Sequence, residues 1–238
     1  MKTPEHLSYW EEECEFSRFV SYCGHDNFWK NHLRKIIMER SHRSILDVGA
    51  GVFVEKKQFD NLNYQIEYSA TEITNKFVEY GKSIGINVAK TDFDVIPFDS
   101  NRFDVVICYD VLNHQLDFKT LVQEMIRVAR KDVIITFFKP FAEDFEAQNE
   151  IKRSINAGMR ARTVKNVGII LDRVVSKINA DIAICTYNYF YRENIENFLK
   201  DQSNISFDFF TVTNPNNPSE IRRCCLITKN LQEGYDCD

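Results

Sequence analysis

The chain has 238 residues, a length that suits one sizeable folded core and does not require a second domain. Its 30 basic and 35 acidic residues give a net charge of −5, which argues against nucleic acid as a partner. The first residues lack the features of a signal peptide, and no apolar run reaches the roughly 20 residues that span a bilayer. Seven scattered cysteines without a Cys-x-x-Cys pair indicate reduced thiols, so we expect a cytoplasmic protein.

The first third of the chain predicts helices followed by strands. Apolar residues at helical spacing in residues 1–43 indicate two helices, which we interpret as an N-terminal helical cap. Short apolar runs at 44–48 and 65–70 are typical of strands. A helix follows the second strand, and we expect Gly81 and Gly85 to end it.

Strands and helices alternate through the middle of the chain. A buried strand is predicted at 102–108, an amphipathic helix at 118–130 and a β-branched strand at 132–138. This alternation is typical of βαβ units in a parallel sheet that helices cover on both faces. Residues 44–140 are therefore expected to form a cofactor-binding core.

The pattern of charged and apolar residues changes after Pro140. An acidic stretch precedes a basic one, and Val164, Leu171 and Val174 recur at helical spacing, so we expect a helical insertion over 141–180.

The last part, residues 181–238, is expected to complete the sheet. It contains a predicted helix at 193–199 and two strands, at 205–212 and 222–228, which a segment rich in turn-forming residues connects. The whole pattern predicts one α/β domain. It has a doubly wound, mainly parallel seven-stranded sheet with helices on both faces and a C-terminal antiparallel hairpin.

Two features indicate a nucleotide-like ligand. The first strand ends in Asp-Val-Gly-Ala-Gly at 47–51, where glycines let the backbone approach a ligand and open the next helix. Glu72 ends the second strand, where a carboxylate can accept both ribose hydroxyls of a nucleoside. A tight turn and a charge that favours the helix N-terminus are the alternative interpretations of these two features.

Later motifs distinguish between ligands. The segment 92–98, Asp-Phe-Asp-Val-Ile-Pro-Phe, precedes Phe-Asp-Val-Val at 103–106, and Leu-Asn-His at 112–114 precedes Glu-Met-Ile-Arg-Val at 124–128. In this order the motifs resemble those of the class I S-adenosylmethionine-dependent methyltransferase family, particularly its small-molecule members. The resemblance extends from about residue 45 to residue 138, and its motifs are specific only in combination.

The resemblance implies S-adenosylmethionine as cofactor, S-adenosylhomocysteine as product, and a role for each matching residue. Asp92 would contact the adenine amino group, with the Phe93 amide near the ring, and Glu72 would hold the ribose. Asp47 and the loop glycines would surround the methionine portion. The expected cofactor-binding residues are Asp47, Gly49, Ala50, Gly51, Glu72, Ile73, Asp92, Phe93 and Tyr109.

One departure from the family pattern bears on cofactor binding. Phe53 stands where the family usually has a third glycine, and a large side chain there would narrow the loop. A catalytically silent subunit or binding protein with the methyltransferase fold is therefore an alternative. A nicotinamide-dependent oxidoreductase fits less well, because Val54 occupies the position of its last glycine.

Methyl transfer needs alignment of donor and acceptor, and a base only when the acceptor must lose a proton. His114 is the candidate base, with a structural role in packing as its alternative. We expect an acceptor pocket built from the variable parts of the chain, for a small-molecule or glycan-type acceptor methylated on oxygen or nitrogen. No metal is expected, because no cluster of potential ligands has suitable spacing. The sequence leaves the acceptor and the oligomeric state open. The candidate acceptor residues are Trp10, Trp29, Asn113 and Tyr189.

Overall fold

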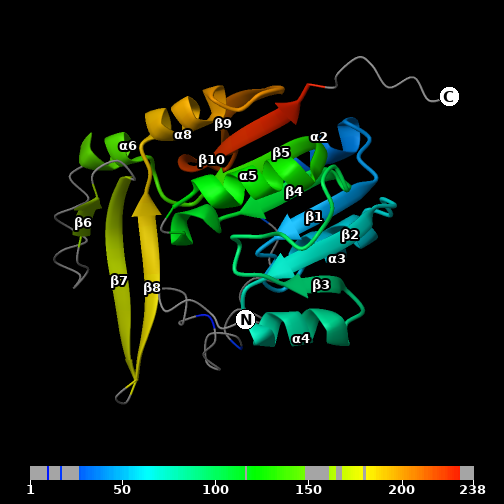
Figure 1. Cartoon of the computed structure of the whole chain (residues 1–238), viewed down its shortest axis with the longest axis horizontal. Helices are drawn as coiled ribbons and strands as arrows, with labels where there is room; N and C mark the ends of the chain where they lie inside the picture. The colour runs from blue at the N-terminus through cyan, green and yellow to red at the C-terminus, as the bar shows by residue number, and fades with distance from the viewer. Residues whose placement is uncertain are drawn as a thin grey trace.

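A twisted seven-stranded sheet forms the centre of the molecule (Figure 1). The computed structural model describes residues 10, 17, 27–115, 117–147, 161–164, 168–178 and 181–230. The strand order is β3-β2-β1-β4-β5-β10-β9. The strands are β1 (Ser44–Val48), β2 (Glu67–Glu72), β3 (Asn87–Lys90), β4 (Phe103–Tyr109), β5 (Ala129–Phe137), β9 (Ile205–Asn214) and β10 (Asn217–Lys229).

Strand direction in this sheet follows the predicted pattern. β1 pairs in parallel with β2 and β4, and the parallel pairing continues to β3 on one side and β5 on the other. β10 lies antiparallel between β5 and β9, so β9 and β10 form a hairpin at this edge of the sheet. The predicted doubly wound, mainly parallel sheet with a C-terminal antiparallel hairpin is confirmed.

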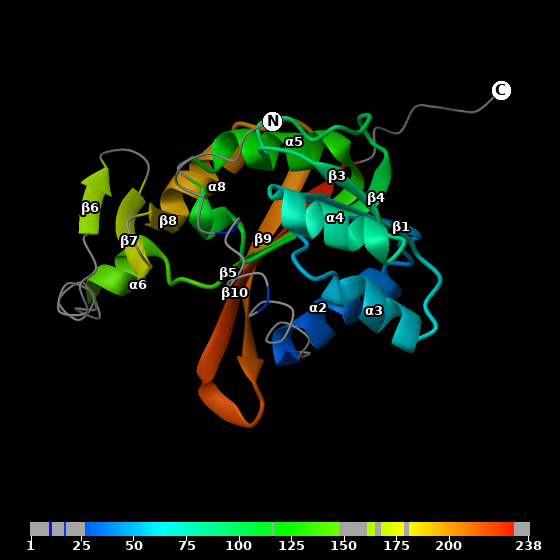
Figure 2. The same ribbon diagram turned by 90° about the horizontal axis from the view of Figure 1, so that it is seen from below.

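Helices cover both faces because the central strands are apolar on both sides. In β4, Val105 and Ile107 pack with one set of helices, while Val106 and Cys108 pack with the other. Figure 2 shows the two helical layers on either side of the sheet. The first layer holds α2 (Phe28–Glu39), α3 (Val54–Asn61) and α4 (Asn75–Ser83), and the second holds α5 (Lys119–Val128) and α8 (Arg192–Lys200).

Several predicted boundaries differ from the observed ones. Gly81 was expected to end its helix, but α4 continues through it to Ser83, and Gly85, with a positive φ, follows the end. The helix predicted to reach residue 130 stops at Val128, because Ala129 already begins β5. Both differences arise from tertiary packing, which overrides local propensity.

The expected helical insertion over 141–180 is wrong for most of the residues that the structure describes there. Only α6 (Ala142–Ala147) is helical among its described residues. β6 (Ala161–Val164), β7 (Gly168–Ile178) and β8 (Asp181–Tyr189) form a second, antiparallel sheet that lies to one side of the main sheet (Figure 1). The physical reason is the density of β-branched residues in this segment, which favours strands over helices. β8 therefore does not belong to the main sheet, which the C-terminal part joins only at Ile205.

The N-terminal cap is described in part. Its second helix is α2, which packs Trp29, Leu33 and Ile37 against the sheet. The first helix of the predicted cap lies outside the described residues. No described helix has both the length and the apolar character that a membrane crossing requires.

Candidate active site

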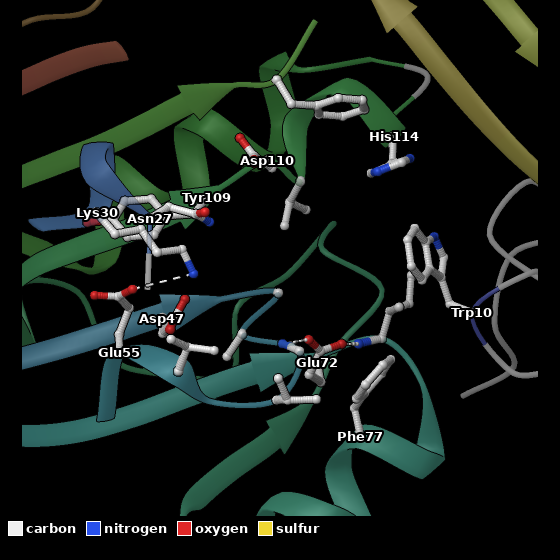
Figure 3. A pocket seen from close by; sticks show the side chains of 18 of the residues that line it. Trp10, Asn27, Lys30, Asp47, Glu55, Glu72, Phe77, Tyr109, Asp110 and His114 are labelled. Atoms are coloured by element: carbon white, nitrogen blue, oxygen red, sulfur yellow. Dashed lines mark hydrogen bonds and ion pairs between the residues drawn. The ribbon is translucent and has the colours of Figure 1, made fainter. Parts of the chain in front are cut away.

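A cavity of about 680 Å³ lies at the carboxyl ends of β1, β2 and β4 (Figure 3). From β1 the chain builds the sheet outward to β3, and then returns to place β4 on the other side of β1. Ligands of open α/β sheets bind at such a reversal of strand order. The volume is in the range of cavities that hold small ligands and cofactors.

The loop after β1 presents bare backbone to this cavity. Gly49 and Gly51 have φ angles of 71° and 57°, a conformation that glycine adopts without steric cost. A Cβ atom on Gly49 would lie 2.4 Å from Cγ2 of Val111, so the loop packs tightly on the segment that follows β4. The glycine loop and the end of β4 therefore form one continuous wall.

Glu72 connects the end of β2 to the glycine loop. One of its carboxylate oxygens accepts a hydrogen bond from the Gly51 amide, and the other accepts one from the Ile73 amide at 3.0 Å. Burial raises the pKa of Glu72 to about 7, against the effect of these two hydrogen bonds. Each oxygen retains a lone pair that can accept a ligand hydroxyl.

Asp47 lies on the neighbouring strand at the floor of the cavity. Its Oδ2 accepts a hydrogen bond from the Tyr68 hydroxyl at 2.6 Å. Burial raises the pKa of Asp47 to about 7, although the Tyr68 hydrogen bond opposes this effect, and the nearby Glu55 raises it further. A cationic group bound here would favour the ionised carboxylate.

A buried ion-pair network joins α2 to the first turn of α3. Arg34 Nη1 lies 2.7 Å from Glu55 Oε2, and Lys30 Nζ lies 3.5 Å from Glu55 Oε1. Arg34 and Glu55 are buried, and Lys30 and Glu55 both line the cavity. The network fixes the N-terminal helix beside the glycine loop.

Phe53 adopts the left-handed conformation, with φ of 58°, directly before α3. Its side chain is buried in the core between α3 and α4, and it does not line the cavity, whereas Val52 and Val54 do. The ring lies against Gly81, where a Cβ would be 2.5 Å from Phe53 Cζ. The large residue in the glycine loop therefore leaves the ligand side of the loop unobstructed.

The other half of the cavity lies over β4, β5 and β10. Tyr109 packs edge-to-face on Trp29 with ring centroids 5.3 Å apart, and the Arg222 guanidinium lies 4.8 Å from the Trp29 ring. Arg222 Nη1 also contacts Asp110 Oδ1 at 2.9 Å. Burial raises the pKa of Asp110, while Arg222 opposes that rise. This half combines an aromatic wall with a paired carboxylate and guanidinium.

His114 ends the short 3-10 helix η2 (Leu112–His114) and lines the cavity. Its ring packs edge-to-face with Trp10 at a centroid distance of 5.1 Å and stacks with Phe138 at 5.2 Å. Figure 3 shows Asp110 and His114 across the cavity from Asp47 and Glu72. The position of His114 in the cavity is compatible with its predicted role as a base. Its contacts with Trp10 and Phe138 are compatible with the alternative, a structural role in packing.

Most of the predicted site residues lie around this one cavity. Asp92, Asn113 and Tyr189 do not line it. Asp92 Oδ1 accepts from the Asp94 amide at 3.2 Å, and Asn113 Nδ2 donates to the Asn188 carbonyl at 2.7 Å, so Asn113 ties β8 to η2. The lining includes Trp10, Trp29, Asp47, Gly49, Ala50, Gly51, Glu72, Ile73, Phe93, Tyr109 and His114.

Sequence reasoning missed several cavity residues. Lys30 and Arg34 have the four-residue spacing of neighbours on one helix face, and this spacing is the available signal for a shared partner. Arg222 lies 112 residues from Asp110 along the chain, so no local pattern connects them. The missed residues that line the cavity include Asn27, Lys30, Glu55, Phe77, Gln115, Phe138, Glu220 and Arg222.

A family model matches the part of the chain that carries the glycine loop and Glu72. Residues 46–137 match the family described as a methyltransferase domain. No curated protein matches the chain closely enough to count as a relative.

Solved structures with the same fold are distant in sequence. A chain from the complex between the Trm112 methyltransferase activator and a candidate methyltransferase of Haloferax volcanii has a TM-score of 0.62. Its identity is 10%, and the match covers 96% of this chain and 100% of that one. The S-adenosylmethionine-bound amino pentose methyltransferase of calicheamicin biosynthesis from Micromonospora echinaspora has a TM-score of 0.59, 13% identity, and coverage of 89% and 95%.

A third structure is the 1,6-didemethyltoxoflavin-N1-methyltransferase of Burkholderia thailandensis with bound 1,6-didemethyltoxoflavin and S-adenosylhomocysteine. It has a TM-score of 0.55, 14% identity, and coverage of 97% of this chain and 93% of that one. The strand order and the glycine loop define the class I methyltransferase fold. Residues 46–137 therefore match a methyltransferase domain, and the chain as a whole has the fold of S-adenosylmethionine-dependent methyltransferases. The family match and the similar solved structures both agree with S-adenosylmethionine as the predicted cofactor.

Proposed function

We propose that the protein transfers a methyl group from S-adenosylmethionine to a small-molecule acceptor, including acceptors of glycan type, on oxygen or nitrogen. One observation carries the proposal. A single cavity combines a half built by the glycine loop and Glu72 with a second half built by β4, β5 and β10. A donor and an acceptor can therefore meet in one cavity.

The residues of the first half fit the cofactor. Glu72 would accept the ribose hydroxyls, because both its oxygens are oriented by backbone amides and keep lone pairs. Asp47 would hold the positively charged amino group of the methionine portion of the cofactor. Its carboxyl is buried, and among the described residues no cationic side chain lies within hydrogen-bond distance of it. Phe93, which lines the cavity, would pack beside the base, whereas Asp92 does not line the cavity and its expected contact with the adenine amino group stays a prediction. When bound, the sulfonium supplies an electrophilic methyl group.

The residues of the second half would align the acceptor and exclude water. The walls formed by Trp10, Trp29, Tyr109 and Phe138 are aromatic, and they suit an acceptor with an apolar face. Methyl transfer is an in-line displacement, and such a reaction gains most from holding its two partners at the correct distance and angle. His114 would accept a proton from the acceptor if that acceptor is a hydroxyl.

Two of the similar structures support a small-molecule acceptor. They are described as an amino pentose methyltransferase and as a 1,6-didemethyltoxoflavin-N1-methyltransferase. The third belongs to a complex with an activator protein, so the neighbours differ in what they bind. The acceptor class therefore rests mainly on the cavity of this chain.

Calorimetric titration with S-adenosylmethionine and S-adenosylhomocysteine tests the proposal, with NAD and NADP as comparison ligands. We expect micromolar binding of the first pair only. Glu72→Gln should weaken that binding at least about tenfold, because it removes a charged acceptor from a buried hydrogen-bond site. A coupled assay for S-adenosylhomocysteine release across small-molecule acceptors then tests turnover.

Glu67→Gln is the matched control, because Glu67 lies at the exposed start of the same strand and pairs with Arg102 on the surface. Its cofactor affinity should equal that of the wild type. Tight binding of NAD, or cofactor affinity that survives Glu72→Gln, contradicts the assignment. Cofactor binding without turnover on any acceptor would favour the catalytically silent alternative.

A further inference from the structure

The charges that line the cavity are unbalanced. Five described lining residues carry carboxyl groups and two carry permanent cations: Asp47, Glu55, Glu72, Asp110 and Glu220 against Lys30 and Arg222. Both cations are already paired, Lys30 with Glu55 at 3.5 Å and Arg222 with Asp110 at 2.9 Å. The described lining therefore leaves no unpaired cation to bind an anionic acceptor.

Asp110 is the carboxylate of the acceptor half, and the structure holds it firmly. Its φ of 64° places it in the left-handed region, which aspartate adopts more readily than most non-glycine residues. The Thr136 hydroxyl donates to Asp110 Oδ1 at 2.7 Å, and the Asp110 amide donates to the same hydroxyl oxygen at 3.0 Å. β5 therefore fixes the direction of this side chain.

One oxygen of Asp110 remains available. Thr136 and Arg222 both bind Oδ1, and Oδ2 has no hydrogen-bond partner among the residues that the structure describes. Asp110 lines the cavity, so Oδ2 is the oxygen that a ligand can reach. Burial raises the pKa of Asp110, and Arg222, which binds the other oxygen, opposes that rise.

Asp110 also lies next to the place where the two halves of the cavity meet. The following residue, Val111, packs directly on Gly49 of the glycine loop. In the sheet register, Asp47 of β1 pairs with Ile107, three residues before Asp110. The carboxylate of Asp110 therefore stands at the boundary between the glycine loop and the acceptor half, where the transferred methyl group would be presented.

We propose that the acceptor is a cationic amine and that Asp110 receives it through Oδ2. This inference rests on the proposed methyltransferase function. The ammonium group gives one proton to Asp110, which leaves a nitrogen lone pair. The new nitrogen–carbon bond forms as the carbon–sulfur bond breaks, and that bonding pair stays on sulfur. The products are the methylated ammonium ion and neutral S-adenosylhomocysteine, and Asp110 passes its proton to solvent.

Sinefungin provides a probe that needs no knowledge of the acceptor. It is a cofactor analogue in which a carbon bearing an amine replaces the methylated sulfur, so its ammonium group lies where the methyl group would be. S-adenosylhomocysteine has the same remaining structure without that cation. We expect wild-type protein to bind sinefungin at least about tenfold more tightly than S-adenosylhomocysteine, because only sinefungin can form a charged hydrogen bond to Asp110. Equal affinities in the wild type would overturn the proposal.

Asp110→Asn should abolish this preference and leave the affinity for S-adenosylhomocysteine within about twofold of the wild type. Asp208→Asn is the matched control, since it removes the same charge from the exposed side of β9 and should keep the preference. A preference that persists in Asp110→Asn overturns the assignment of Asp110. If the wild type does not bind S-adenosylhomocysteine at all, the proposed methyltransferase function is wrong. The two failures are therefore distinguishable.

Discussion

The aromatic ring of Phe53 occupies the space that a side chain at Gly81 would fill. A Cβ on Gly81 would lie 2.5 Å from Cζ and 2.8 Å from Cε2 of Phe53. Gly81 has no special backbone conformation in the middle of α4, so its role is to make room. This pair explains how the chain accommodates a phenylalanine in its glycine loop.

Gly81→Ala is therefore expected to destabilise the protein, although alanine normally favours a helix. The added methyl group overpacks the core, which costs about 1 to 3 kcal/mol. Urea unfolding measures the change. Glu79→Ala, at an exposed position of the same helix, should change the free energy of unfolding by less than about 0.5 kcal/mol. Phe53→Leu should reduce the cost of Gly81→Ala in the double variant, and additive effects would contradict direct contact.

Phe53→Gly separates folding from ligand binding. The substitution removes the backbone strain of a non-glycine residue in the left-handed region, which stabilises the folded state by about 1 kcal/mol. It also removes a buried aromatic ring, which destabilises the folded state by about 3 kcal/mol or more. We expect net destabilisation with little change in cofactor affinity, since the ring does not line the cavity. Denaturation and calorimetry on the same sample give both quantities. A large gain in cofactor affinity would show that Phe53 obstructs the site.

Cofactor affinity should depend on pH near neutrality. Burial raises the pKa of Asp47 and of Glu72 to about 7, so both take up protons below that pH. A bound cation favours ionised Asp47, and bound hydroxyls favour ionised Glu72. Affinity is therefore expected to rise from about pH 6 to about pH 8. Calorimetry across this range tests the prediction, and Asp47→Asn should flatten the profile.

The same two groups act on folding with the opposite sign. Their pKa values in the folded protein lie above the ordinary values of 3.8 and 4.5, so the folded state holds more protons between about pH 4 and pH 7. The ligand-free protein should therefore lose stability from these groups as pH rises through that window. Urea midpoints at several pH values measure this trend. A smaller slope is expected in Glu72→Gln, and an unchanged slope would contradict the assignment.

The buried pair between Arg34 and Glu55 should contribute far more to stability than the exposed pair on the same helix. Glu55→Ala leaves a buried guanidinium without its carboxylate, which costs about 3 kcal/mol or more. Glu39→Ala removes the exposed partner of Lys35, 3.7 Å away, at a cost of about 0.5 kcal/mol or less. Thermal unfolding of both variants gives the comparison. Similar losses would show that the network is not structurally important.

Local sequence determined the core of the methyltransferase domain. The β-branched runs and the glycines at 47–51 impose strands and a turn through interactions within a few residues, so β1, β4, β5 and the position of Glu72 followed from pattern alone. The alternation of strands with helices along the chain also implied helices on both faces of the sheet. These features depend on short-range sterics and on which residues avoid water.

Only the tertiary structure decided the rest. Val164, Leu171 and Val174 suit a helix by spacing, but β7 pairs with both β6 and β8, so these residues lie in an antiparallel sheet. The direction of the Phe53 ring depends on a gap at Gly81, 28 residues away in sequence. Asp110 and Arg222 meet because β10 returns beside β5, and this contact joins residues that no local pattern relates. Contacts between distant residues are set by how the whole chain packs, and they decide what the cavity can bind.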